Sequence, residues 1–483
     1  MRIRVTLFLL TLFVFTSWAK TNTDIEKADI IYFESKPYSI EQILSKYLQI
    51  QSLSGSEAEA GKFLKSLCAE NGLYITQMGD TNGNYNFTAS VVPLDKKIPN
   101  IILLNHLDVV PAGDVSNWKH PPFSGKITDS EIWGRGAWDN KGAAIMQIFT
   151  AIEMSKRYKN RFPKYNISVF SVSCEETQCE GGIKYVLDNY LDILNPAVVI
   201  GEGAPALKGV ISNKPDLSLF GISVAQKRAL WIRLELELKT NGHSSVTPLT
   251  YANKEMVVAL NKVFDRKTKI IYNELNTDLL KQFGTLNKGF TGFVLKHPRL
   301  FKALITPKLR EDPMLLSLFT NTMTLTSLDD NNSKINTISN KVTALMDCRL
   351  LPGESTDKFL KNLRRMLSNR KITIEILQES KDPPISSSQT FFYKNLEKAI
   401  LKNYQQSKTA SVFLPNANDI SLFREYGIPG YSSVPVELDQ KYLHRVHGYN
   451  ERIPRNILNK GKDTFVDFIE LCLDEIEITS EQM

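Results

Sequence analysis

The 483-residue chain lacks the short motifs that mark many common enzyme chemistries. It contains no C-x-x-C pair, which excludes thiolate zinc sites and thioredoxin-like redox chemistry. The absence of G-x-S-x-G excludes a hydrolase nucleophile elbow. The absence of G-x-x-x-x-G-K-[ST] and of G-x-G-x-x-G excludes the common nucleotide-binding loops. H-E-x-x-H is also absent, so a zincin with a single metal ion is excluded.

Cysteine and concentrated charge are scarce as well. The five cysteines are an odd, sparse set and not a disulfide framework. Cys174 and Cys179 are close enough in sequence to pair in an oxidising compartment, but the pattern alone does not predict that they do. Lys and Arg number 59 against 52 Asp and Glu, a net charge of +7, and no basic block is present that would track phosphates. A nucleic-acid partner is therefore not expected.

Long hydrophobic runs are missing except at the N-terminus. Arg2 and Arg4 precede an apolar run over residues 5–15, and the small residues Ser17 and Ala19 follow it. This pattern predicts a secretory signal peptide over residues 1–19. The run is short for a membrane span, so an uncleaved anchor is the less favoured alternative, and no stable membrane insertion is expected after cleavage. The expected location is secreted or periplasmic.

The remaining composition, 42% hydrophobic and 23% charged, is typical of globular proteins, and the length suggests two or three domains. Up to about residue 222, strand-like and helix-like stretches alternate. Apolar runs at 101–104, 167–172 and 197–200 predict strands buried on both faces, and residues 140–154 predict a helix. The alternation predicts an α/β fold with a helix-covered, mostly parallel sheet.

The pattern changes over residues 223–380. At 230–239, apolar and polar residues alternate strictly, which predicts a strand with one exposed face. The signals that follow have the order β-α-β-β-α-β, which predicts an inserted α+β lid domain. Residues 281–319 do not fit this order. They are interpreted as additional helices that cover the fold. The alternative is an apolar wall that contacts a hydrophobic substrate. The first pattern returns over 381–483, so the domain that begins at residue 20 is predicted to be completed there.

The predicted buried strands end in an unusual set of side chains. His106 and Asp108 follow the first strand, Glu175 and Glu176 the second, and Glu202 the third. In open α/β sheets, ligands bind beyond the carboxyl ends of the strands. Each of these residues alone is more simply read as structural. Because three strands end in such residues at the same edge of the sheet, a functional site is the favoured interpretation.

Metal binding is the chemistry that this set indicates. In extended chain, residues two apart point the same way, so the Asp108 carboxylate can accept a hydrogen bond from one imidazole nitrogen of His106 and leave the other free to bind a metal ion. The alternative is a His–Asp hydrogen bond with no metal ion. Asp139 lies between glycines and just before the predicted helix. It is either an N-cap or a carboxylate that bridges two cations. His447 is distant in sequence, but the returning half of the domain can bring it to the same edge.

Eight motifs occur in the order found in one known family. They are HLDVVP (106–111), WxxPPFSG (118–125), GRGAWDNKG (134–142), the Glu175–Glu176 pair, GEG (201–203), GHSS (242–245), DxRLLPG (347–353) and HGxNERI (447–453). On these motifs the chain resembles the M20 metallopeptidases. The N-terminal leader, the long lid and the residues of the motifs are most similar to the carboxypeptidase S and N-fatty-acyl-amino-acid hydrolase branch.

The resemblance implies a site with two zinc ions, with cobalt and manganese as alternatives. His106, Asp139 and Glu202 would bind one ion, while Asp139, Glu176 and His447 would bind the other, so that Asp139 bridges the two. The peptide bond after Asp139 is expected to be cis, as in similar proteins.

The resemblance also implies roles for residues that do not bind metal. Glu175 would be the general acid and base, and Asp108 would hold His106. His243, on the lid, would polarise the scissile carbonyl. Arg349 would bind the free carboxylate of the substrate, and the Asn336 amide would help to hold it.

The predicted function is a secreted dizinc amidohydrolase or carboxypeptidase. Its substrate would be a small peptide or an N-acyl amino acid, cleaved at the amide next to an amino acid with a free carboxylate. An exported dizinc aminopeptidase and a non-catalytic binding protein on the same fold are the alternatives. A homodimer is left open, because in dimeric relatives the lid histidine reaches the partner's site. Three departures from the family pattern are Cys174, where many relatives have Asp, the stretch Asn416-Ala-Asn-Asp419, where Asn-Thr-Asp is more usual, and Ser421, where Arg is common.

Overall fold

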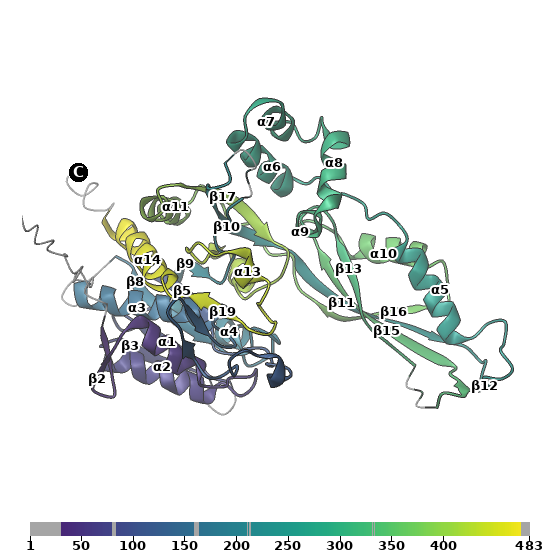
Figure 1. The fold of residues 1–483 in the computed structure, drawn as a ribbon, viewed down its shortest axis with the longest axis horizontal. Coiled ribbons are helices and arrows are strands. Elements are labelled where there is room, and N and C mark those ends of the chain that lie inside the picture. The colour runs from purple at the N-terminus through teal and green to yellow at the C-terminus, as the bar shows by residue number, and fades with distance from the viewer. Residues whose placement is uncertain are drawn as a thin grey trace, which may run out of the picture.

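The chain folds into a broad body and an elongated one that projects from it (Figure 1). The computed structural model describes residues 30–79, 84–158, 164–209, 211, 214–330, 332 and 334–474. The predicted signal peptide over 1–19 lies outside them. Across the described ranges, no helix is both long and apolar enough to cross a membrane.

A mostly parallel sheet of eight strands is the framework of the broad body (Figure 1). From one edge to the other its strands are β17 (Ser407–Leu414), β10 (Ser218–Gln226), β18 (Gly430–Ser432), β9 (Pro196–Gly201), β5 (Asn100–His106), β8 (Asn166–Val172), β4 (Asn86–Ser90) and β3 (Tyr74–Met78). The central strand β5 runs parallel to both β8 and β9, and β18 runs parallel to β9. The predicted strands at 101–104, 167–172 and 197–200 are therefore β5, β8 and β9.

Successive side chains of the central strands enter two different hydrophobic cores. Ile101 and Leu103 of β5 face one core, and Ile102 and Leu104 face the other. This is why these strands read as continuous apolar runs. The first core is packed by helices α1 (Ile40–Leu48), α2 (Ala58–Glu70), α3 (Lys141–Tyr158), α11 (Phe391–Asn403) and α14 (Ile457–Asp474). The second is packed by α4 (Ile183–Leu194) and α12 (Ile420–Glu425). The helix-covered sheet has the predicted fold class.

Smaller elements complete the broad body. They are the pair β1 (Ile31–Phe33) and β2 (Lys36–Tyr38), the sheet of β19 (Arg452–Pro454), β7 (Glu131–Trp133) and β6 (Lys126–Ile127), the helix α13 (Gln440–Leu443) and one turn of 3-10 helix at Val115–Asn117. The strand β19 positions the C-terminal HGxNERI motif next to β7.

The elongated body contains an antiparallel four-stranded sheet. Its order is β13 (Thr322–Asp329), β15 (Lys341–Leu350), β11 (Arg228–Glu237) and β16 (Thr373–Glu379), and helices α5 (Ala252–Phe264) and α10 (Thr356–Leu367) pack against it. Along the chain this is the predicted order β-α-β-β-α-β. The alternating leucines and isoleucine of β11, such as Leu230 and Ile232, lie under the two helices, and its polar residues face outward. At the far end, β12 (Gly242–His243) pairs with β14 (Thr337–Ile338).

The chain crosses from one sheet to the other at Lys227, so the sequence boundary at 222/223 falls inside β10. Residues 223–226 belong to β10, which lies between β17 and β18 in the large sheet. Strict alternation begins only with β11. The Lys227 ammonium donates to the carbonyls of Ser317 and Thr320 at 3.2 and 3.0 Å.

A further group of helices lies beside the β17 edge of the large sheet (Figure 1). It consists of α6 (Glu274–Leu286), α7 (Gly289–Lys296), α8 (Lys302–Glu311) and α9 (Pro313–Ser317). It has a core of its own, which includes Leu280, Val294 and Ile305. Through Gln282, α6 exchanges two hydrogen bonds with the backbone of Ser411 on the edge strand β17. The predicted helical cover thus begins seven residues before residue 281 and shields a sheet edge.

Candidate metal centre

The carboxyl ends of three parallel strands meet at one edge of the large sheet. His106 is the last residue of β5, Glu175 and Glu176 follow β8, and Glu202 directly follows β9. One ligand atom each from His106, Glu175 and Glu202 lie within 4.8 Å of one another, and so do atoms from His106, Asp139 and Glu176. The structure therefore brings together the side chains that the sequence placed at this edge.

Asp139 is the centre of the cluster. Its Oδ1 lies 3.1 Å from Nε2 of His106, and its Oδ2 lies 3.1 Å from Nε2 of His447. Nε2 of His106 is also 3.7 Å from Glu202, and Nε2 of His447 is 3.2 Å from Glu176. Each imidazole thus faces one oxygen of Asp139 and one glutamate. The Asp139–Asn140 peptide bond is cis, as expected.

Glu451 holds the Asp139 turn, a role that the sequence reading missed. It is fully buried, and its carboxylate accepts hydrogen bonds from the backbone N–H groups of Gly136, Trp138 and Asp139. It also forms a 2.7 Å ion pair with Arg135. Because Glu451 lies in the same HGxNERI motif as His447, one segment both supplies a candidate ligand and fixes the turn of another.

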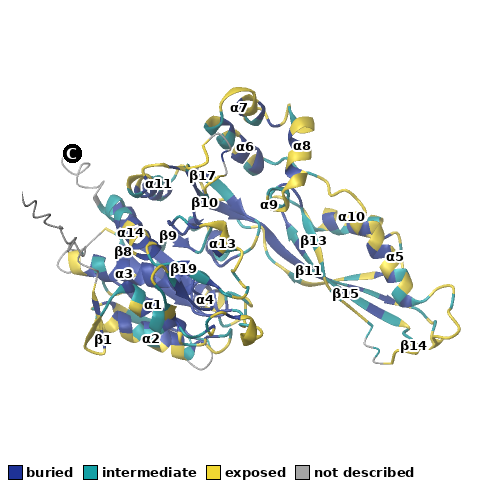
Figure 2. Cartoon of the chain, viewed as in Figure 1, coloured by how far each residue is buried: buried dark blue, intermediate teal, exposed yellow. Residues whose placement is uncertain are grey.

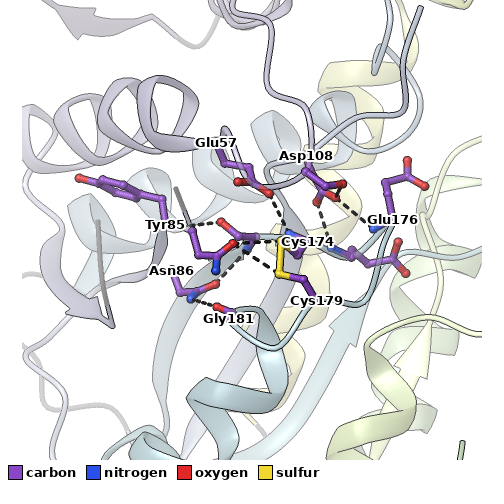
Figure 3. Close-up of a disulfide and its surroundings, with 12 residues drawn as sticks. Glu57, Tyr85, Asn86, Asp108, Cys174, Glu176, Cys179 and Gly181 are labelled. Carbon is purple, nitrogen blue, oxygen red and sulfur yellow. Dashed lines mark hydrogen bonds between the residues drawn. A yellow bond between two sulfur atoms is a disulfide. The ribbon is translucent and has the colours of Figure 1, made fainter. Parts of the chain in front are cut away.

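Asp108 fixes the backbone beneath the glutamate pair (Figure 3). Its buried carboxylate accepts from the Glu175 and Glu176 N–H groups at 3.1 Å each, and from the Ser54 hydroxyl at 2.7 Å. The predicted contact with His106 is present in a modified form. Nδ1 of His106 lies 3.0 Å from the main-chain oxygen of Asp108 and 3.4 Å from its carboxylate. Asp108 thus orients His106 and also organises the loop that carries Glu175 and Glu176.

The cluster concentrates negative charge in a buried place. Burial raises the pKa of Glu202 to about 8 and that of Asp419 to about 7, and burial together with the charge of Glu202 raises the pKa of Glu175 well above its ordinary value. From the sequence Asp419 was noted only within a departure from the family pattern and not as a site residue, yet it lines the same small cavity. Within the described residues, no lysine or arginine forms an ion pair with these acids or with Asp139. The groups that face the carboxylates are the imidazoles of His106 and His447, and hydrogen bonds to Asp139 and Glu176 raise the pKa of His447 to about 10. Bound cations would take over this balance of charge.

Divalent cations fit this donor set. Oε1 of Glu176 is buried and makes no hydrogen bond in the described part of the chain, although it faces His447. An imidazole and carboxylates on each side of Asp139 are the ligands that zinc and similar ions take. Two cations would satisfy the unpaired oxygen and neutralise the excess charge.

A disulfide closes the loop that carries the glutamate pair. The sequence did not predict it, but the structure pairs Cys174 with Cys179 (Figure 3). The Cys174 N–H also donates to the Glu57 carboxylate at 3.0 Å. The loop is therefore held by the disulfide on one side and by Asp108 on the other.

We expect loss of this disulfide to weaken the site. Replacing Cys174 and Cys179 together by alanine should lower the free energy of unfolding by about 2 kcal/mol, because closing a short loop restricts the unfolded chain. Urea unfolding with and without reductant measures this. The wild type should lose stability on reduction, whereas the double variant should not respond to the reductant. Equal stability of both proteins under oxidising conditions would contradict the expectation.

Three predicted site residues lie outside the cluster. His243 is on β12, at the tip of the elongated body farthest from the large sheet (Figure 1). Its exposed imidazole lies 2.8 Å from the Ser245 hydroxyl and 3.4 Å from the Asn336 amide nitrogen. Arg349 is near the opposite end of that body, and its guanidinium binds both oxygens of Asp347 at 2.8 and 2.9 Å. The structure pairs His243 with Asn336, but it does not bring them to Asp139.

Comparison with known proteins gives a consistent result. The family model described as "Peptidase family M20/M25/M40" matches residues 102–471. The "Probable carboxypeptidase S-like 2" of Dictyostelium discoideum is 26% identical over 392 residues, which cover 77% of this chain and 71% of the relative. The "N-fatty-acyl-amino acid synthase/hydrolase PM20D1" of Mus musculus is 26% identical over 459 residues, or 91% and 89% of the two chains. Among solved structures, the M20 family metallo-carboxypeptidase Sso-CP2 from Sulfolobus solfataricus aligns with a TM-score of 0.67 at 19% identity, and covers 90% of this chain and 99% of that one.

Proposed function

This chain belongs to the peptidase family M20/M25/M40, and on that premise we propose that it is an exported amidohydrolase with two zinc ions. As a member of the family it is a metal-dependent hydrolase. The proposed substrate is a peptide or an N-acyl amino acid with a free carboxylate next to the scissile amide. The relatives named as a carboxypeptidase and as an N-fatty-acyl-amino acid hydrolase support this substrate class.

The position of Asp139 carries the proposal. Its two oxygens face two imidazoles, and each imidazole has a glutamate beside it. His106, Asp139 and Glu202 would hold one zinc ion, and Asp139, Glu176 and His447 the other. When bound, the two ions supply Lewis acidity, which polarises the scissile carbonyl and lowers the pKa of water.

Glu175 is the proposed proton carrier. Its backbone is fixed by Asp108, and its side chain lines the cavity beside His106 and Glu202. The Glu175 carboxylate would take a proton from the attacking water and deliver it to the nitrogen of the leaving amine. Burial raises the pKa of Glu175 and nearby cations would lower it, so the carboxylate could both accept and release the proton.

Arg349 is the proposed anchor for the substrate carboxylate. Its guanidinium already binds a carboxylate in a two-point contact, that of Asp347. A substrate carboxylate offers the same geometry and would compete with Asp347 for it. Arg349 lies near the junction of the two bodies, close enough to Lys227 for their charges to interact.

We propose that His243 completes the site of a second copy of the chain. It is exposed at the tip of the elongated body with Asn336, remote from its own Asp139. His243→Ala should lower turnover about 10²-fold through the loss of one donor to the developing oxyanion, with the metal content unchanged. Mixing this variant with an inactive Glu175→Gln variant should restore about a quarter of the wild-type activity, because each mixed dimer contains one intact site. A mixture that recovers no activity after subunit exchange would show that His243 acts within its own chain.

Export is proposed from the N-terminal sequence and is supported by the Cys174–Cys179 disulfide. Disulfides persist in oxidising compartments and are rare in the reducing cytosol.

A hydrolysis screen tests the proposed function. Dipeptides and N-acyl amino acids, each with a free or an amidated carboxylate, would be incubated with the protein and added zinc. Cleavage should require the free carboxylate and should tolerate a blocked amino end. A requirement for a free amino end would indicate an aminopeptidase instead. No hydrolysis of any substrate would favour the non-catalytic alternative.

A further inference from the structure

The helical group α6–α9 has an unusual charge pattern. Residues 279–310 contain no aspartate or glutamate in 32 consecutive positions. The same stretch contains seven basic residues: Lys281, Lys288, Lys296, Arg299, Lys302, Lys308 and Arg310. Acidic residues lie only at its margins, where Asp278 pairs with Lys281 and Glu311 pairs with Lys308. Within the described residues, Lys288, Lys296 and Arg299 have no acidic partner. Lys296 and Arg299 line one surface hollow with Glu274 and Asp278. Over residues 274–312 seven basic residues stand against four acidic ones, so the helical group keeps an excess of positive charge.

Large apolar side chains of the same segment are exposed. Phe290 and Phe293 of α7 are 69% and 51% exposed, and Leu300 just before α8 and Leu304 in its first turn are 76% and 54% exposed. The core of this helical group is packed without them. Single exposed apolar residues are ordinary, but two phenylalanines and two leucines within 15 residues require a physical reason.

These four exposed side chains lie on α7 and on the segment that leads into α8, and with the basic residues around them they form what we call the insertion face. The ring of Phe293 lies 5.5 Å from that of Phe301 and so links the outer side of α7 to the beginning of α8. Leu300 immediately precedes Phe301, and Leu304 follows it by about one helical turn. Figure 2 shows α7 and α8 with exposed residues along their outward sides, at the end of the helical group that points away from the large sheet. The insertion face comprises Phe290, Phe293, Leu300 and Leu304 with Lys288, Lys296, Arg299 and Lys302.

We propose that the insertion face binds an anionic lipid surface. Exposed aromatic and aliphatic side chains enter the boundary between headgroups and acyl chains, and surrounding lysine and arginine side chains are attracted to anionic headgroups. The positive charge complements such a surface. The enzyme would associate with the membrane peripherally through this face, without any helix that spans the bilayer.

A second copy of the chain fits this face poorly. A symmetric contact would place the same basic residues of two copies against each other, which costs free energy through like-charge repulsion. The inference is independent of the proposed reaction, because the insertion face contains none of the candidate metal ligands.

Vesicle co-sedimentation of the full chain tests the proposal. The wild type should bind vesicles of phosphatidylcholine mixed with phosphatidylglycerol, and should bind pure phosphatidylcholine vesicles weakly. Replacing Phe290 and Phe293 together by serine should weaken binding about tenfold or more. Reversing charge with Lys288→Glu and Lys296→Glu should abolish the preference for anionic vesicles. As a matched control, Val257→Ser with Phe264→Ser removes comparably exposed apolar side chains from α5 and should leave binding unchanged.

Two further measurements make the result decisive. Turnover of a soluble substrate should be the same in the wild type and in all of these variants, which shows that they fold. Sedimentation equilibrium should show no change in association state on replacing Phe290 and Phe293. The proposal is overturned if the wild type does not bind anionic vesicles, if the control pair weakens binding as much as the phenylalanine pair, or if the phenylalanine pair abolishes self-association instead.

Discussion

Replacing Glu175 by glutamine will lower turnover by about 10²–10⁴-fold, the contribution typical of a positioned general acid and base. Glutamine keeps the size of the side chain and loses its ability to carry a proton. The Glu175 backbone, which donates to Asp108, is unaffected, so the loop should keep its shape. The metal content should equal that of the wild type because Glu175 is not among the proposed ligands.

The control for this variant lies in the same region of the chain. Glu180→Gln removes an exposed glutamate just after the loop and should leave turnover unchanged. Turnover numbers with a saturating N-acyl amino acid, together with elemental analysis of each protein, measure both effects. If Glu175→Gln retains wild-type turnover, Glu175 is not the proton carrier. If it loses zinc, Glu175 is a ligand.

Replacing Asp139 by alanine should have the largest effect in the molecule, because one carboxylate serves both cation positions. We expect the protein to lose both ions and all measurable activity. His447→Gln should lose the ion shared with Glu176 and retain the one held by His106 and Glu202. Inductively coupled plasma mass spectrometry after dialysis gives the metal content, which should fall from two per chain to one in His447→Gln and to none in Asp139→Ala.

Asp129→Asn is the matched control for that series, since Asp129 is exposed and lies outside the cluster. It should retain both ions. Circular dichroism should show that Asp139→Ala remains folded, because Glu451 holds the turn through backbone N–H groups that the substitution leaves in place. Two ions retained in Asp139→Ala would contradict a bridging role.

The strands that lead to the site could be predicted from the sequence because they are buried on both faces. A strand that is buried on both faces has to be apolar at every position, so β5, β8 and β9 stood out as continuous runs. Parallel strands end at a common edge, and this alone gathers His106, the Glu175–Glu176 pair and Glu202. Asp139 and His447 were also candidates from the sequence, and the motif resemblance assigned them roles as metal ligands. The structure brings all six side chains to one edge.

Other parts depend on tertiary contacts that no local pattern records. Glu451 functions through N–H groups more than 300 positions away in the chain, so in sequence it reads as an ordinary acid beside an arginine. Asp419 is a candidate site residue only because burial places it beside Glu202. The disulfide between Cys174 and Cys179 depends on how the loop after β8 folds back.

The positions of His243 and Arg349 were the least predictable. They lie at opposite ends of the elongated body, and their distance from Asp139 depends on how that body projects from the chain crossing at Lys227 (Figure 1). The basic character of α7 and α8 was missed for a different reason. The lysines and arginines are spread among apolar residues over 32 positions, so no dense cluster of basic residues marks the segment in the sequence.

The central claim is that two cations lie on either side of Asp139. X-ray diffraction from crystals grown with zinc, recorded above and below the zinc absorption edge, tests it directly. Two anomalous peaks are expected, one beside His106 and Glu202 and the other beside His447 and Glu176, with the Asp139 carboxylate between them. A single peak, or peaks that Asp139 does not contact, would contradict the account.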